Sequence, residues 1–127
     1  MSKVHNPANV APPASRYSQG VEVEATRWLH ISGQVGVKPD GTLAGGTEAQ
    51  MVECWRRIFK LLDSADMARE NLVKVTAYLT NANDIGLYRV VRDRMLDGFE
   101  TASTLVIVAG LADPNWTVEI EAIAAAP

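Results

Sequence analysis

Two glutamates near the end of the chain are the residues best placed to do chemistry. Over residues 117–124, apolar and polar residues alternate, so Val118 and Ile120 share one face of a predicted strand and Glu119 and Glu121 share the other. A strand that buries one face can present the other to water, a ligand or a partner subunit, so this acidic face is the first place to look for chemistry. Acidic residues at such positions are also commonly just solvated, and this segment alone leaves both interpretations open.

The other residues that could act as nucleophiles or metal ligands lack partners in the sequence. Cys54 is the only cysteine, and His5 and His30 are the only histidines, which leaves no disulfide framework and no metal-ligand spacing. Cys54 has no basic neighbour in the sequence and is expected to be a buried or half-buried structural thiol. His30 alternates with apolar neighbours, which favours a structural histidine over an acid or base.

Length and composition predict one globular domain over residues 1–127. The chain is 47% hydrophobic and 21% charged, with a formal net charge of −3, and its lysines and arginines are scattered. This distribution provides no electrostatic footprint for a nucleic acid or an anionic membrane. No apolar run is long enough to cross a bilayer, and no secretory signal is visible. We therefore expect a cytoplasmic protein without nucleic-acid or membrane partners.

The glutamates must be positioned by a sheet. Prolines at positions 7, 12 and 13 make residues 1–15 an irregular N-terminal arm, and alternation predicts a hairpin of strands over 18–24 and 27–32. The later predicted elements are a helix from Glu48 to near Ala65 with Thr47 as its N-cap, a strand over 72–80, a helix between Asn81–Asp84 and Gly98, a strand over 104–108 and the final strand. The order β-β-α-β-α-β-β fits an α+β mixed sheet with two helices on one face. Its other face is left uncovered, which favours oligomerisation.

The first predicted helix has a clear apolar side. Met51, Trp55, Ile58 and Leu62 recur at helical spacing, and Glu53 and Arg57 are assigned to the solvated side. In the strand that follows, strict alternation predicts that Val73, Val75, Ala77 and Leu79 share one face.

Four segments taken together resemble the Rid family of YjgF-like reactive intermediate deaminases. They are Tyr17-Ser18-Gln19-Gly20, Ile31-Ser32-Gly33-Gln34, Val73-Lys74-Val75-Thr76-Ala77-Tyr78-Leu79-Thr80 with Asn83-Asp84 behind it, and Val118-Glu119-Ile120-Glu121-Ala122-Ile123-Ala124. Any one of them arises readily by chance, but their order and spacing on elements of the right type are specific. The resemblance covers nearly the whole chain and implies a chorismate-mutase-like fold and a homotrimer.

The resemblance also implies a function and a site. Members with deaminase activity hydrolyse 2-imino acids to 2-keto acids and ammonia in pockets between subunits, without a metal or an organic cofactor. Tyr17 matches the tyrosine that lines the pocket, and Glu119 matches the glutamate that positions or activates water. Glu121 would support Glu119. Ser32 and Gly33, in the second matching segment, are expected to contact the substrate.

One departure from the family pattern concerns substrate binding. In deaminating members an arginine binds the substrate carboxylate, and the corresponding position in this sequence is Ser103. A single neutral hydroxyl in place of a bidentate guanidinium weakens carboxylate binding by about 2 kcal/mol. Arg89 falls where relatives place an asparagine that faces the pocket, so its guanidinium is a candidate replacement. The alternative interpretation is that Arg89 is a solvated helix residue paired with Asp93, four residues further along the chain.

Two function classes stay open from the sequence. One is a Rid-type imine or enamine hydrolase with altered substrate choice, whose ligand is a small imine, enamine or carboxylate. The other is a non-catalytic trimer that binds a small metabolite or a protein partner in the same clefts. Ribonuclease activity, a label attached to some relatives, is disfavoured by the acidic charge balance and the lack of paired histidines.

Overall fold

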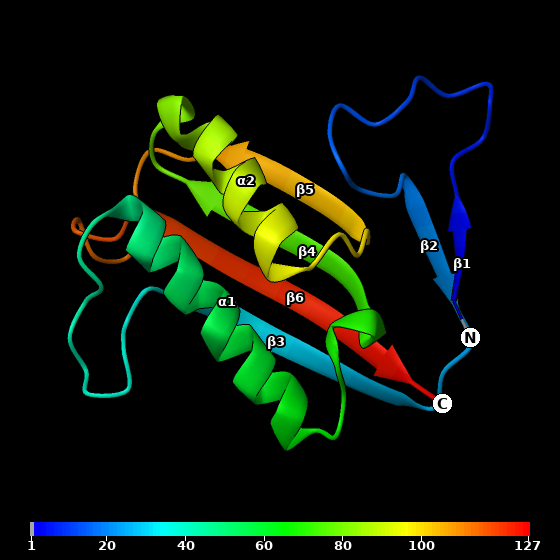
Figure 1. Cartoon of the computed structure of the whole chain (residues 1–127), viewed down its shortest axis with the longest axis horizontal. Helices are drawn as coiled ribbons and strands as arrows, with labels where there is room; N and C mark the ends of the chain where they lie inside the picture. Colours follow the sequence, from blue (N-terminus) through cyan, green and yellow to red (C-terminus); the bar gives the residue numbers. More distant parts are fainter. Residues whose placement is uncertain (1) are drawn as a thin grey trace.

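The computed structural model describes residues 2–127 and confirms a mixed sheet with both helices on one face (Figure 1). The strands are β1 (Ser2–His5), β2 (Gly20–Val23), β3 (Arg27–Val35), β4 (Leu72–Leu79), β5 (Ala102–Ile107) and β6 (Val118–Ala126); the helices are α1 (Thr47–Ser64) and α2 (Ile85–Met95), with short 3₁₀ turns at Arg69–Asn71 and Ala82–Asp84. Asn81 begins the second turn, where its side chain accepts a hydrogen bond from the Asn83 N–H at 2.9 Å.

The main sheet has the strand order β3-β6-β4-β5. β6 is antiparallel to both of its neighbours, whereas β4 and β5 are parallel. Parallel neighbours need a crossover connection, and α2 provides it here. In Figure 1, α1 and α2 lie side by side over the same face of this sheet. We call this the helix face and the opposite one the open face.

The predicted alternation of β6 determines which of its residues face the hydrophobic core. The core lies between the helices and the sheet. It contains Val118, Ile120, Ala122 and Ala124 of β6, Val75, Ala77 and Leu79 of β4, and Met51, Trp55, Ile58, Leu62, Tyr88 and Val91 of the helices. In β4 a shift in register between Leu72 and Lys74 places Leu72 in the core and leaves Val73 only half-buried. The prediction for Val73 was therefore wrong, because a bulge adds a residue without changing the local alternation.

Two predictions about the N-terminal region were also wrong. Residues 2–5, expected within an irregular arm, form β1, which runs antiparallel to β2 with Val4 opposite Val21. β2 does not form a hairpin with β3; β3 pairs with β6 instead, with Ile31 opposite Ala122. Alternation identifies a strand but not its partner, since pairing is decided by contacts between distant segments. The observed order is β-β-β-α-β-α-β-β.

Glu53, assigned to solvent, is buried with only 3% of its surface exposed. The loop between β3 and α1 folds beside this flank of α1, where Ala44 is buried and its N–H donates to the Gly36 carbonyl at 2.8 Å. Helical periodicity marks the side that faces the sheet but carries no information about a loop that packs elsewhere. At the start of α1 the N-cap is Gly46, with φ 93°, and Thr47 is the first helical residue.

The open face has no covering element in the part of the chain described. Trp28 on β3 is 51% exposed, and Val106 on β5 is exposed as well. This agrees with the expectation that one sheet face stays uncovered. Neither helix within residues 2–127 combines the length and the apolar character needed to cross a bilayer.

Candidate functional site

The site residues predicted from the sequence fall into two groups on opposite faces of the sheet. Ser103 on β5 pairs with Val75, which is buried beneath the helices. Glu119 on β6 pairs with Tyr78, which alternates with the buried residues of β4 and points to the open face. Residues opposite one another on neighbouring strands share a face. Ser103 and Glu119 therefore point away from each other within one chain.

A cavity of about 150 Å³ on the helix face, which we call the helix-side cavity, brings three predicted residues together. It is lined by Ala14, Ser15, Tyr17, Arg89, Arg92, Ser103 and Leu105. Tyr17, Arg89 and Ser103 were expected at the site from sequence. Arg92 was not, although its spacing of three residues from Arg89 places both on one side of a helix.

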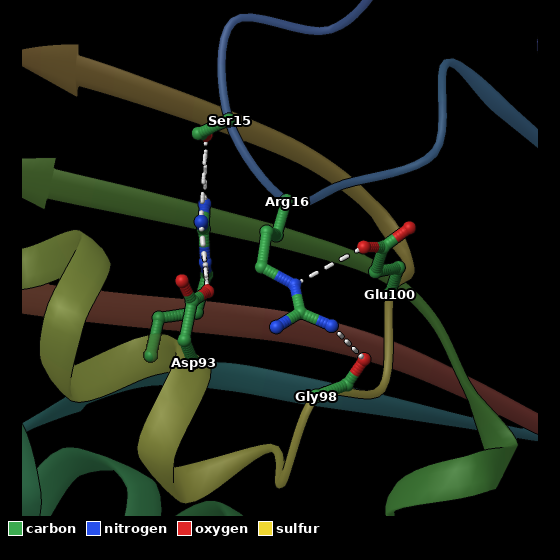
Figure 2. Close-up of polar contacts among 6 residues, drawn as sticks. Ser15, Arg16, Asp93, Gly98 and Glu100 are labelled. Atoms are coloured by element: carbon green, nitrogen blue, oxygen red, sulfur yellow. Dashed lines mark hydrogen bonds and ion pairs between the residues drawn. The ribbon is translucent and has the colours of Figure 1, made fainter.

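Tyr17 reaches this cavity because the chain before β2 is tied to the start of β5. The Ser18 N–H donates to the Thr101 carbonyl at 3.0 Å, and Ser18 forms an isolated parallel bridge with Ala102. Arg16 reinforces the attachment, as Figure 2 shows, with Nε 3.3 Å from Glu100 Oε2 and Nη2 donating to the Gly98 carbonyl at 3.4 Å. The segment that carries Tyr17 is therefore held against the sheet edge.

The expected pairing of Arg89 with Asp93 is wrong. Asp93 Oδ1 instead lies 2.9 Å from Nη2 and 3.0 Å from Nε of Arg92. Arg92 is only 4% exposed, so the nearby carboxylate compensates a buried charge that would otherwise be costly. Arg89, which is half-buried, has no ion pair or side-chain hydrogen bond with any other residue between 2 and 127. Its guanidinium is free to meet a ligand at the cavity wall.

The second group lies on the open face, where Glu119 meets Gly33. β3 is irregular between Ile31 and Gln34, so Ser32 and Gly33 form a bulge beside β6. A Cβ atom on Gly33 would overlap Glu119 Oε2 and stand 2.7 Å from Cδ. The carboxylate thus lies directly against the Gly33 backbone, a contact that only glycine permits.

The bulge is held in place from the helix face. Gln34 is buried, and its Nε2 donates to the Ser32 carbonyl at 2.9 Å while its Oε1 accepts from Arg57 Nε at 2.9 Å. The Cys54 thiol lies 3.2 Å from the Gln34 carbonyl oxygen. Arg57, assigned to the solvated side of α1, therefore helps to support the site.

The second carboxylate of the open face has a different partner. The Tyr78 hydroxyl donates to Glu121 Oε1 across β4 and β6. This bond to a carboxylate favours the neutral phenol and raises the pKa of Tyr78 above its ordinary value. Glu121 is thereby fixed in place as an acceptor, while Glu119 makes no side-chain hydrogen bond or ion pair within residues 2–127. The two glutamates are therefore inequivalent, and Glu119 is the one available to a water.

Cys54 matches the structural thiol expected from the sequence. It lies on the buried side of α1, and burial raises the pKa of its thiol to about 12. It therefore stays protonated and unreactive near neutral pH. Between residues 2 and 127, no group of three or more histidine, cysteine, aspartate or glutamate side chains is arranged to hold a metal ion.

Comparisons with known proteins agree on one family. The family model described as Endoribonuclease L-PSP matches residues 8–126. A RutC family protein of Aquifex aeolicus is 35% identical over 117 residues, covering 88% of this chain and 90% of that protein. A 2-iminobutanoate/2-iminopropanoate deaminase of Mus musculus is 32% identical over 126 residues, covering 98% and 88%. Among solved structures, YyfB of Yersinia pestis, described as a Rid family protein of unknown function, superposes with a TM-score of 0.90 at 27% identity and 98% coverage of both chains.

Proposed function

Because the chain belongs to the Endoribonuclease L-PSP family, which includes the Rid or YjgF-like proteins, we propose that it hydrolyses small imines or enamines to carbonyl compounds and ammonia. The observation that carries this proposal is the pair of half sites. Tyr17, Arg89 and Ser103 line a small polar cavity, and Glu119, which has no side-chain partner in the described part of the chain, lies against the Gly33 bulge. The first can bind a substrate and the second can direct a water.

The two half sites support a homotrimer in which the cleft lies between copies. They lie on opposite sheet faces, so a substrate that uses both must receive Glu119 and Gly33 from one copy and the helix-side cavity from another. The uncovered open face, with Trp28 half-exposed, offers a surface for this association. A closed ring of three chains would repeat the same cleft three times.

Hydrolysis of an imine requires few catalytic groups. A protonated imine carbon is already electrophilic, so water adds to it once a base removes a proton from that water. The water oxygen forms the new C–O bond while the C=N π electrons move to nitrogen. The base then returns this proton to the carbinolamine nitrogen and takes the hydroxyl proton, so that the C=O bond forms while the C–N bond breaks and ammonia leaves with its electron pair. Glu119 is assigned as the base, and Tyr17 orients the substrate.

The residue at position 103 is the basis of altered substrate choice. Ser103 offers one hydroxyl where deaminating relatives are expected to place a guanidinium, so a carboxylate must be bound by other residues. Arg89 and Arg92 line the same cavity, and Arg89 has no ion pair within residues 2–127, so Arg89 is one candidate for that role. Ser32, exposed beside Gly33, is assigned to the opposite wall of the cleft.

The alternative is a trimer that binds a small metabolite or a protein partner in these clefts without catalysis. The serine at position 103 is the observation that favours it. The two functions differ in whether the protein accelerates imine decay, and this can be measured directly.

The experiment generates 2-imino acids with an amino-acid oxidase in the presence of semicarbazide, which traps imines that have not been hydrolysed. Keto-acid release is compared for the wild type and for the Glu119→Ala and Ser103→Arg variants. Acceleration by the wild type that disappears in Glu119→Ala supports hydrolysis. No acceleration by the wild type, but a gain in Ser103→Arg, would favour the binding function.

A further inference from the structure

We propose that Arg92 is the main anion-binding residue of the helix-side cavity, and that a small monocarboxylate binds the edge of its guanidinium that Ser15 now occupies. This inference deepens the proposed function, on which it rests, by assigning the carboxylate of the substrate to a buried arginine of α2. No motif of the sequence singles out Arg92, and its role follows from the geometry around it.

The two edges of the Arg92 guanidinium are engaged very differently. One edge is tightly bound to Asp93, with Nε and Nη2 at 3.0 and 2.9 Å from a single carboxylate oxygen. The other edge points to Ser15, where Nη1 and Nη2 both lie 3.4 Å from the same hydroxyl oxygen. Figure 2 shows Ser15 and Asp93 apart from each other, each with a dashed line that marks its contact.

The Ser15 edge is the one that suits a carboxylate. Two N–H groups that share one neutral oxygen at 3.4 Å are at the long limit of hydrogen bonding. A carboxylate has two charged oxygens with the spacing of the guanidinium fork, and it forms two parallel, shorter bonds there. Ser15 lines the cavity and lies on the segment before β2, so a small displacement of its side chain frees the fork.

The guanidinium is held rigidly before any ligand arrives. Arg92 is buried, Asp93 fixes one edge, and the Arg92 Cζ atom lies 6.0 Å from the centre of the Tyr88 ring. A fixed donor loses little conformational entropy on binding, unlike an exposed arginine that must first be ordered. Burial also strengthens the attraction for an anion.

Charge and volume define the ligand class. Within one chain, Arg89 and Arg92 bring two positive charges to the cavity region and Asp93 brings one negative charge, which leaves one positive charge on this wall of the cleft. A monoanion balances this charge, whereas a dianion would leave an uncompensated negative charge. A cavity of about 150 Å³ holds on the order of five water-sized groups, so the bound portion is a carboxylate with a short carbon chain.

The test measures binding separately from catalysis, using 2-oxobutanoate as the probe and 2-butanone, which lacks the carboxylate, as the matched uncharged compound. Titrations are followed by ¹H–¹⁵N NMR, including the arginine Nη–H signals. The wild type should bind 2-oxobutanoate, with a shift of the Arg92 Nη–H signals, and should bind 2-butanone at least about tenfold more weakly. Equal affinity for both compounds, or an unchanged Arg92 signal, would overturn the proposal.

Variants separate Arg92 from its neighbours on α2. Arg92→Lys keeps the charge but removes the fork, and it should weaken 2-oxobutanoate binding at least about tenfold, while Arg89→Gln should weaken it less. Arg94→Gln is the control, because the Arg94 side chain is 54% exposed and its only ion pair is to Glu48 at 3.7 Å within the described chain. Thermal unfolding shows whether each variant is folded. A folded Arg92→Lys variant with wild-type affinity would refute the role of the fork.

Ser15→Ala gives a second, independent readout. This variant removes the group that now occupies the fork, so 2-oxobutanoate should bind at least as tightly as it does to the wild type. A loss as large as that in Arg92→Lys would mean that Ser15, and not the fork, holds the anion. A wild-type protein that binds 2-oxobutanoate through Arg92 but accelerates no imine decay would disprove the proposed function and leave the anion site intact.

Discussion

The carboxylate of Glu119 on β6 lies against the backbone of Gly33 on β3, where a Cβ atom would overlap its Oε2. The Gly33→Ala variant should therefore displace the carboxylate without unfolding the protein, because the end of the Glu119 side chain can move. We expect imine hydrolysis to fall at least about tenfold, since a shift of 1 Å in a catalytic group has effects of this size or greater. The free energy of unfolding should change by less than about 1 kcal/mol.

Gly110→Ala is the matched control for this prediction, because a Cβ there meets no atom within 4 Å and Gly110 has no positive φ. The reaction rate of the Gly110→Ala variant should equal that of the wild type. Adding Gly33→Ala to Glu119→Ala should cause no further loss, since the group that it displaces is already absent. Additive losses would mean that Gly33 acts independently of Glu119.

Tyr78 should titrate above its ordinary pKa of 10.0, because its hydroxyl donates to the Glu121 carboxylate and ionisation would break that bond. Ultraviolet absorbance at 295 nm as a function of pH, compared between the wild type and Tyr78→Phe, isolates this one tyrosine. In Glu121→Gln the pKa of Tyr78 should fall back toward 10.0. A Tyr78 that titrates at or below 10.0 in the wild type would contradict the assigned hydrogen bond.

Cys54 should be unreactive toward iodoacetamide at pH 8 in the folded protein and should react once the chain is unfolded. Burial raises the pKa of this thiol from 9.0 to about 12, so at pH 8 the folded protein keeps the proton, while about a tenth of the thiols in the unfolded chain are reactive thiolates. The free energy of unfolding should therefore decrease between pH 9 and 12, and the decrease should be smaller in Cys54→Ala. Rapid modification of the folded protein would show that the site opens.

Three chains should associate in solution, which gives a mass of about three times 13.8 kDa by sedimentation equilibrium. Trp28→Glu places a charge on the open face and should shift the protein toward monomers. Val90→Glu is the control, since Val90 is 62% exposed on α2, away from the open face, and its substitution should leave the mass unchanged. A wild-type monomer would remove the basis for a cleft between copies.

Much of the fold and part of the site could be predicted because they depend on local patterns. Alternation along β6 predicted Val118 and Ile120 in the core and both glutamates on the other face. Helical spacing predicted that Trp55 of α1 faces the core. These predictions succeed because strand and helix periods are fixed by backbone geometry. The resemblance to the Rid family located Tyr17, Arg89 and Ser103, which line one cavity.

The tertiary structure decided every feature that depends on which distant groups meet. It paired β2 with β1, buried Glu53 beside a loop, and inserted a bulge that excludes Val73 from the core. It also assigned Asp93 to Arg92, which leaves Arg89 without an ion pair among residues 2–127 and gives the cavity its positive charge. The sequence by itself determined the elements and their faces, since these follow from the order of side chains along the backbone. Strand partners and charge pairs follow from packing in three dimensions, which no local pattern encodes.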